Sequence, residues 1–394
     1  MTTYTARWIF PVSQPPLERG TVTVDGERIV AVEPHGSRTP DVDLGNIAII
    51  PGLVNAHTHL DLSGARGLIP PTDPEHFTDW LIGVIAYRKT RTPEQVQADI
   101  REGLAECLKF GTTLLSDIAA GGESWKILSD SQLRARIDLE VICLAQERIN
   151  DVAMRAIEWL KDHVETEHCT SGLSLHSPYS IHRDAFRHLA ERINISIHLA
   201  ESPSEVELVH RHTGRHLEFL NALQVWEPDS LVESFEFVYT RLRVARTSLF
   251  IHGNYLSGDE KIWPRQTIVF CPRTHAAFKH PRHPVLKFLN RGVRVALGTD
   301  SLASNPDLDL LAEARFTFQH YPEVAGELIM EMATINGAEA VDCADTCGSL
   351  VPGKSADFVT VPLPDDESDP YELLLGTTAI DGPRRTLFRG EWRS

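Results

Sequence analysis

Histidines near the ends of apolar, strand-length segments are the residues of this chain whose spacing could do chemistry. His57 and His59 lie one residue apart in NAHTHLDL, shortly after a Pro-Gly pair. Side chains alternate across a strand, so residues two apart point to the same side. Imidazoles grouped in this way are common ligands of zinc and iron(II). One pair is weak evidence, and the rest of the chain has to supply further ligands.

The same alternation can be applied to four later apolar segments. In each, the apolar residues form one side and a polar residue near the end lies on the other. These polar residues are His176 in GLSLHS, His198 in ISIHLAES, His252 in SLFIHG and Asp300 in VRVALGTD. Any one of these histidines could be an ordinary core residue. Together, five histidines and an aspartate would be costly to bury unless a divalent metal, such as zinc or iron(II), paired them.

A barrel would bring these residues together. Eight apolar segments alternate with helical ones across the middle of the chain, namely IIPGLVNAH, TTLLSDI, LEVICLAQE, GLSLHSPY, ISIHLAES, SLFIHGN, TIVFCPRT and VRVALGTDS. Such alternation indicates parallel strands with helical crossovers. Eight units predict an α/β fold of the closed (β/α)₈ type, whose active site is built at the carboxyl ends of the strands.

The two chain ends have a different sequence pattern, which predicts short strands and turns. The Asp25-Gly26 pair joins two alternating runs in TVTVDGERIVAVEP, which predicts a hairpin. GSLVPGKSADFVTVPL and RRTLFRGEWR near the other end also look like strands. We therefore expect a small β-sandwich formed by residues 1–51 and 347–394, with the barrel over residues 52–346.

One helix can be predicted in detail from TPEQVQADIREGLAECLKFG. Thr92 is a plausible N-cap, Pro93 suits the first helical position and Gln95 completes a capping box. Gly111 suits the left-handed position after the helix end. The predicted apolar stripe consists of Val96, Ile100, Leu104 and Leu108.

The composition of the chain limits the kinds of partner that it can bind. The chain is 42% hydrophobic and 24% charged, with a net charge of -17. This acidity disfavours nonspecific binding to nucleic acid or to an anionic membrane, so a small-molecule partner is expected. The N-terminal sequence lacks a signal-peptide pattern and no apolar stretch has the length of a membrane span, which predicts a cytoplasmic protein. Six scattered cysteines predict free thiols, although Cys343 and Cys347 lie close in sequence.

Glu201 lies in the turn after the ISIHLA segment. Counting from His198 would send it to the outer side, but the turn lets the chain swing it over the barrel mouth. A glutamate beside a metal-bound water is placed for acid/base catalysis. Without the histidines, a solvated loop glutamate would be an equal explanation.

Together these motifs resemble the amidohydrolase superfamily. The matching pieces are HTH after PGLVNA, SIHLAE, FIHGN, LGTDS and the tail GSLVPGKSADFV. The chain is most similar to the subgroup of hydrolytic deaminases and chlorohydrolases that includes S-adenosylhomocysteine/5-methylthioadenosine and aminodeoxyfutalosine deaminases. The resemblance covers nearly the whole chain and is specific for the superfamily, but not for the substrate.

The resemblance implies roles for individual residues. His57, His59, His198 and Asp300 would bind one divalent metal, most simply zinc, with iron(II) as the alternative. Asp300 would also take the proton as hydroxide adds to the carbon that carries the amino group. Glu201 would move protons to a ring nitrogen, and His252 would hydrogen-bond the attacking water. No lysine lies in LSLHSPYS, which favours a single metal.

The substrate implied is an amino-substituted heterocycle of the adenosine type, contacted by His176. Arg273 and His275, in CPRTHAAFKHPRHP, are candidates to hold an anionic part of it, and Arg148 is a weaker one. A solvated basic loop explains the same charges equally well. Trp80, with Phe77, is a candidate wall for an aromatic ring, although plain packing is the more common role of such residues.

Other functions remain open. The same site could hydrolyse a cyclic amide or displace a ring halide, and release of ammonia would separate these reactions from deamination. A relative without activity could serve as a binding protein, because a fold does not guarantee a function. A homodimer is compatible with the resemblance.

Overall fold

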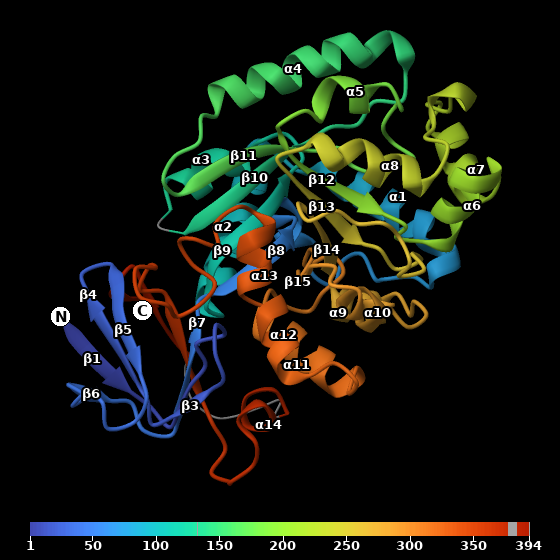
Figure 1. Cartoon of the computed structure of the whole chain (residues 1–394). Coiled ribbons are helices and arrows are strands. Elements are labelled where there is room, and N and C mark those ends of the chain that lie inside the picture. The colour runs from blue at the N-terminus through green and yellow to red at the C-terminus, as the bar shows by residue number, and fades with distance from the viewer. Residues whose placement is uncertain (132, 377–383, 394) are drawn as a thin grey trace. The chain divides into compact units, whose positions relative to one another are not determined.

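The computed structural model of the chain describes residues 1–131, 133–376 and 384–393 (Figure 1). Its residues form two compact units. The first consists of residues 1–56, 105–115 and 309–394, and the second of residues 57–104 and 116–308. The boundaries drawn from the sequence at residues 51/52 and 346/347 stay a prediction. No disulfide joins any of the six cysteines, all of which lie in the described residues.

An eight-stranded sheet forms the barrel, and its strands are neighbours in the order of the sequence. The strands are β8 (Leu53–Thr58), β9 (Thr112–Ala119), β10 (Arg134–Glu140), β11 (Cys169–Ser174), β12 (Asn194–Leu199), β13 (Thr247–His252), β14 (Gln266–Phe270) and β15 (Val295–Leu297). A parallel bridge between Thr58 and Asp300 connects the first strand to the segment after the last. The predicted (β/α)₈ architecture is confirmed.

Helices follow the strands along the chain, and α4, α5 and α8 lie on the outer side of β10 to β13 (Figure 1). The helices are α1 (Phe77–Thr90), α2 (Pro93–Lys109), α3 (Ser124–Ser129), α4 (Ile149–Asp162), α5 (Ala185–Leu189), α6 (Pro203–Arg211), α7 (Arg215–Ala222), α8 (Phe235–Arg241), α9 (Pro272–Ala277), α10 (Val285–Asn290), α11 (Leu310–His320), α12 (Gly326–Met332), α13 (Ile335–Ala340) and α14 (Pro370–Leu375). Within the described ranges, no helix has both the length and the apolar character needed to cross a membrane.

Helix α2 confirms the predicted capping box. The Thr92 N–H donates to Gln95 Oε1 at 3.0 Å, and the Gln95 N–H donates to Thr92 Oγ1 at 3.4 Å. Gly111 has a φ of +91°, as the helix end requires. The predicted stripe is wrong at Leu108, which is 40% exposed, whereas Cys107 is buried. Each step of four residues turns about 40° past a full revolution, so the stripe leaves the buried face.

The third barrel strand begins and ends earlier than predicted. Strand β10 covers RARIDLE rather than LEVICLAQE, and Ile142, beyond its end, is 54% exposed. Polar residues interrupt this strand, so its sequence does not form the apolar run by which the other strands were predicted. Arg136 and Asp138 are both fully buried, with Arg136 Nη2 2.8 Å from Asp138 Oδ2. Because the two charges pair with each other, the barrel interior tolerates them.

Two smaller sheets come from the two chain ends. The first has the order β5-β4-β1-β6, formed by β1 (Thr2–Thr5), β4 (Thr21–Asp25), β5 (Arg28–Glu33) and β6 (Val42–Asp43). The second has the order β18-β17-β16-β7-β2-β3, formed by β2 (Trp8–Ile9), β3 (Leu17–Glu18), β7 (Ile47–Pro51), β16 (Phe358–Pro362), β17 (Arg385–Phe388) and β18 (Glu391–Arg393). Tyr4, Val22, Phe358 and Leu387 share one core. The predicted hairpin at Asp25-Gly26 is confirmed by the antiparallel pairing of β4 and β5.

Candidate metal and catalytic site

Three strand ends bring the four predicted ligands together in the second unit. His57 lies on β8 and His59 directly follows it, His198 lies on β12, and Asp300 follows β15. All four side chains are buried. His59 Nε2 lies 3.2 Å from His198 Nε2, His57 Nε2 lies 3.4 Å from Asp300 Oδ1, and His59 Nε2 lies 4.0 Å from the same oxygen. Three imidazoles and one carboxylate therefore converge on one point.

These spacings fit a divalent metal. Zinc binds nitrogen and oxygen ligands at about 2.0–2.1 Å in a tetrahedron, whose ligand atoms are then about 3.3–3.4 Å apart. Two of the three measured distances lie close to this value, and the third is longer by less than an ångström. His57 also belongs to a second group with His198 and His252, whose ligand atoms lie within 4.8 Å of one another. Residues 57, 59, 198 and 300 are thus able to hold one ion, with His252 beside it.

The electrostatics of the site favour metal-binding protonation states. Burial, followed by the neighbouring imidazoles, lowers the pKa of His59 and of His198 well below the ordinary value. Burial works against ionisation of Asp300, but the hydrogen bond from His57 and the nearby imidazoles keep the pKa of this carboxyl below its usual range. Ser304 Oγ donates to Asp300 Oδ2 at 3.0 Å. Neutral imidazoles and an ionised carboxylate are the forms that bind a cation.

Glu201 reaches the same point by a break in the strand. Ala200 has a φ of +51°, and this left-handed residue interrupts the alternation after β12. Glu201 Oε1 lies 3.2 Å from His252 Nε2. Burial, then the charges of Asp300 and Glu205, raise the pKa of Glu201 well above its ordinary value. A buried neutral carboxyl group beside the candidate metal ligands is able to donate a proton.

Left-handed backbone recurs at the strand ends that carry the site. His252 has a φ of +69° and Asp300 a φ of +60°, in addition to Ala200. This conformation is unfavourable for residues with a Cβ atom and is often found at functional sites. Glu205 stabilises the turn at Ala200, since its two carboxylate oxygens accept the N–H groups of Ala200 and Glu201 at 3.0 and 2.7 Å.

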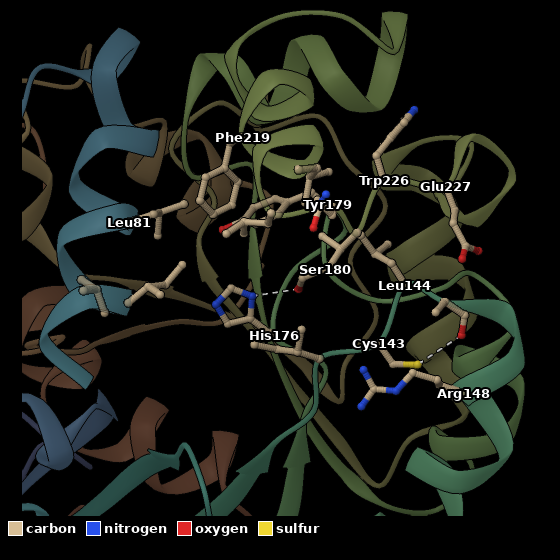
Figure 2. Close-up of a pocket in the computed structure, with 18 of the residues that line it drawn as sticks. Leu81, Cys143, Leu144, Arg148, His176, Tyr179, Ser180, Phe219, Trp226 and Glu227 are labelled. Carbon is tan, nitrogen blue, oxygen red and sulfur yellow. Dashed lines mark hydrogen bonds between the residues drawn. The ribbon is translucent and has the colours of Figure 1, made fainter. Parts of the chain in front are cut away.

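The site lies in a small chamber that adjoins a larger cavity. The space that we call the reaction chamber, of 50 Å³, is lined by the candidate ligands His59, His198 and Asp300, by Glu201 and His252, and by Phe77 and Trp80. The outer cavity, of 470 Å³, has Leu81 and Phe219 on one side and Arg148, Trp226 and Glu227 on the other (Figure 2). Five residues line both spaces and define a junction: Leu81, Val84, Arg88, His176 and Tyr179.

The residues predicted to contact substrate divide into two groups. His176 lines the junction, Trp80 the reaction chamber and Arg148 the outer cavity. His176 Nδ1 lies 2.8 Å from Ser180 Oγ, which orients its ring (Figure 2). Arg273 and His275 line neither space.

Arg273 and His275 have partners elsewhere. Arg273 Nη2 pairs with Asp307 Oδ1 at 2.6 Å. His275 is buried in α9, with Nδ1 2.9 Å from Asn254 Oδ1. The alternative of a solvated loop is wrong for His275, because this residue is only 5% exposed. The structure therefore gives no support to an anion site formed by these two residues.

Sequence reasoning missed an ionic group at the junction. Arg88 Nε donates to Asp61 Oδ2 at 2.9 Å, and Arg88 Nη1 donates to Glu140 Oε2 at 3.2 Å. Arg88 lies eight residues after Trp80, on the same face of α1. Glu140 is the last residue of β10. A correct end for this strand would have indicated Glu140, because active-site residues follow the carboxyl ends of barrel strands.

The chain is similar to known proteins over most of its length. The model of the amidohydrolase family matches residues 48–390. A 5-methylthioadenosine/S-adenosylhomocysteine deaminase of Pyrococcus abyssi is 28% identical over 370 residues, covering 88% of this chain and 82% of the relative. A 5'-deoxyadenosine deaminase of Methanococcus maripaludis is 29% identical over 345 residues, covering 82% of this chain and 76% of the relative.

Solved structures have the same fold. Helicobacter pylori aminofutalosine deaminase in complex with methylthio-coformycin superimposes with a TM-score of 0.85 at 21% identity, over 100% of both chains. Atrazine chlorohydrolase from Arthrobacter aurescens, complexed with zinc, gives a TM-score of 0.78 at 19% identity, over 100% of this chain and 95% of the other. The resemblance predicted from the motifs is confirmed. The chain belongs to the amidohydrolase family and is a hydrolase of carbon–nitrogen bonds.

Proposed function

We propose that this enzyme removes the amino group of an adenosine-type nucleoside by hydrolysis and releases ammonia. The observation that carries the proposal is the contact of Glu201 with His252, at 3.2 Å, beside the four converging ligands. A buried acid next to a metal site is what a ring nitrogen needs when water adds to the neighbouring carbon. The deaminase names of the relatives point to the same reaction.

We propose one divalent metal, zinc in the first instance, held by His57, His59, His198 and Asp300. When bound there, the metal would act as a Lewis acid and make a water molecule nucleophilic at neutral pH. Asp300 accepts the proton that the attacking water loses, and Ser304 keeps this carboxylate oriented. His252 holds the oxygen of the water through Nε2.

Glu201 carries out the remaining proton transfers. As the neutral acid, it protonates the ring nitrogen next to the carbon that water attacks. The carbon then bears both the hydroxyl and the amino group. Asp300 returns a proton to the amino group, the carbon–nitrogen bond breaks, and ammonia leaves. The hydroxyl proton goes to Glu201, so the product carries a ring carbonyl and both carboxyl groups regain their starting protonation states.

The outer cavity supports a nucleoside larger than a free base. Leu81, Leu144 and Phe219 give it an apolar lining, and it opens from the junction next to the reaction chamber. A ring bound near the metal would place its sugar at the junction and a substituent on the 5' carbon in this cavity. Names of the relatives include nucleosides of this kind, such as 5-methylthioadenosine and S-adenosylhomocysteine.

Ammonia release tests the proposal. The zinc-loaded enzyme is assayed with 5'-deoxyadenosine, 5-methylthioadenosine, S-adenosylhomocysteine, aminodeoxyfutalosine, guanine, cytosine and an aminotriazine. We expect ammonia from at least one adenosine-type nucleoside. Glu201→Gln should keep its metal and lose about 10²- to 10⁴-fold in kcat, the range of acid/base catalysis. Ammonia from none of the nucleosides, or full activity of Glu201→Gln, would contradict the proposal.

A further inference from the structure

Glu140 has one carboxylate oxygen that the protein leaves without a hydrogen bond. Its side chain is 5% exposed, and Oε2 accepts from Arg88 Nη1 at 3.2 Å. Oε1 is buried and has no hydrogen-bond partner among residues 1–131, 133–376 and 384–393. His176 Nε2 lies 3.9 Å from Oε1, too far for a hydrogen bond. Glu140 also lines the reaction chamber.

The surrounding charges leave this oxygen able to accept another hydrogen bond. Arg88 is shared between Glu140 and Asp61, so one guanidinium serves two carboxylates. Leaving a carboxylate oxygen without a hydrogen-bond donor costs far more free energy when the oxygen is buried than when it is exposed to water. A ligand that brings a donor to Oε1 would remove this cost on binding. Arg88 meanwhile fixes the position of the carboxylate through its other oxygen.

The location of Glu140 indicates which part of a substrate would bring the donor. Arg88 and His176, its two neighbours, both line the junction between the reaction chamber and the outer cavity. If the base of a nucleoside lies at the metal and its 5' substituent lies in the outer cavity, the sugar must occupy the junction. Sugars offer hydroxyl donors, and carboxylates recognise ribose hydroxyls in other nucleotide-binding folds.

We propose that Glu140 Oε1 accepts a hydrogen bond from a ribose hydroxyl, the 2' or the 3' group, of the nucleoside substrate. Arg88 is the positioning residue for this contact. The inference rests on the proposed deaminase function and narrows its substrate class to nucleosides with the 2' and 3' hydroxyls of ribose, in preference to 2'- or 3'-deoxynucleosides and free bases.

Removing the hydroxyl from the substrate and the carboxylate from the enzyme tests this contact. The adenosine-type substrate with the highest activity, its 2'-deoxy analogue and its 3'-deoxy analogue are compared on the wild type, Glu140→Gln and Glu140→Leu. On the wild type, kcat/KM should be about 10- to 100-fold lower for at least one deoxy analogue, as expected for a hydrogen bond to a charged group. On Glu140→Leu, the ribo and deoxy substrates should become nearly equal.

Glu140→Gln separates recognition from folding. The amide has the same shape and still accepts from a hydroxyl, so the preference for the ribo substrate should be smaller but present. Glu158→Gln is the matched control, because Glu158 is exposed on α4, lines neither the reaction chamber nor the outer cavity and should leave the preference unchanged. A purely structural role of Glu140 would lower kcat/KM for all substrates by the same factor.

The outcomes distinguish this inference from the proposed function. Ammonia release with the same ribo-to-deoxy ratio in the wild type and Glu140→Leu would overturn the contact with Glu140 alone. Equal activity of the wild type on the ribo substrate and both analogues would do the same. Ammonia from no nucleoside at all would overturn the proposed function together with this inference.

Discussion

Asn254 donates a hydrogen bond from its side-chain amide to the backbone carbonyl of Glu201, with a nitrogen–oxygen distance of 3.0 Å. The other end of this amide is held by His275, whose Nδ1 lies 2.9 Å from Asn254 Oδ1. On its amino side, Glu201 donates its N–H to Glu205. Both peptide groups of Glu201 are therefore fixed by side chains. His275, which the sequence suggested as a substrate contact, is linked to the site through Asn254.

Asn254→Ala is expected to lower kcat without loss of metal. Without the amide, the turn that holds Glu201 loses one of its supports, and misplacement of a catalytic group slows the chemical step more than it weakens binding. We expect a fall in kcat of about 10-fold, with KM and zinc content close to those of the wild type. Asn150→Ala, at an exposed position of α4, is the control. An unchanged kcat in Asn254→Ala would show that this contact does not position Glu201.

Metal content tests the role of His198. Its Nδ1 lies 2.9 Å from the backbone oxygen of His176, which directs Nε2 towards His59. His198→Ala removes one of the four proposed ligands and should reduce bound zinc well below one ion per chain, measured by elemental analysis. His188→Ala, at an exposed position of α5, should keep the wild-type content. Full occupancy in His198→Ala would remove this residue from the metal site.

Removing the metal with a chelator should also lower the melting temperature of the wild type. An ion that binds only the folded chain stabilises it by mass action. The shift should be much smaller in His198→Ala, where the site is incomplete. An equal shift in both proteins would mean that the chelator acts on a different ion or on the chain itself.

The sequence predicted the residues that lie within regular strands. His57, His198 and His252 follow the alternation of their strands, because a β backbone turns successive side chains to opposite sides. Glu201 did not follow it, since the left-handed φ of Ala200 is not visible in a residue pattern. The third strand was misplaced because the buried Arg136 looks like a surface residue until its partner is known.

Contacts between distant segments account for the remaining differences. His275 was interpreted as part of a basic loop, yet it is buried against Asn254, 21 residues earlier. His283 is also buried, with Nε2 2.8 Å from the backbone oxygen of His252. A histidine counts as polar in any sequence pattern, whereas its burial depends on partners that only the folded chain brings together. The pairing of Glu140 with Arg88, which are 52 residues apart, likewise depends on the folded chain and cannot be predicted from a local pattern.

Trp80→Phe separates packing from hydrogen bonding in the reaction chamber. The indole Nε1 of Trp80 is buried without a hydrogen-bond partner in the described part of the chain. Phenylalanine keeps ring contacts with Phe77 and Phe278, whose centroids lie 5.6 and 5.2 Å from that of Trp80, but lacks the N–H. We expect kcat/KM for the nucleoside to fall about 10-fold, because the substrate loses the hydrogen bond that the indole N–H would donate to it.

Trp263→Phe is the control for this substitution, because Trp263 lines neither the reaction chamber nor the outer cavity. Its kcat/KM should match that of the wild type. Wild-type kcat/KM in Trp80→Phe as well would mean that Trp80 only packs against its neighbours, the plainer of the two interpretations that its sequence allows.

Glu205 should make the stability of the fold depend on pH. Burial raises the pKa of Glu205 from 4.5 to about 7, although the backbone N–H groups that donate hydrogen bonds to this carboxylate act to lower the pKa. The folded chain therefore holds this proton more tightly than the unfolded chain. The resulting stabilisation is complete below pH 4.5 and is lost as the pH rises through 7. Denaturant unfolding of Glu201→Gln and of Glu201→Gln/Glu205→Gln measures it without titration of the neighbouring carboxyl. Only the first variant retains Glu205, so its free energy of unfolding, relative to that of the double variant, should fall by about 3 kcal/mol between pH 4 and pH 8. A difference between the two variants that does not depend on pH would contradict the assignment.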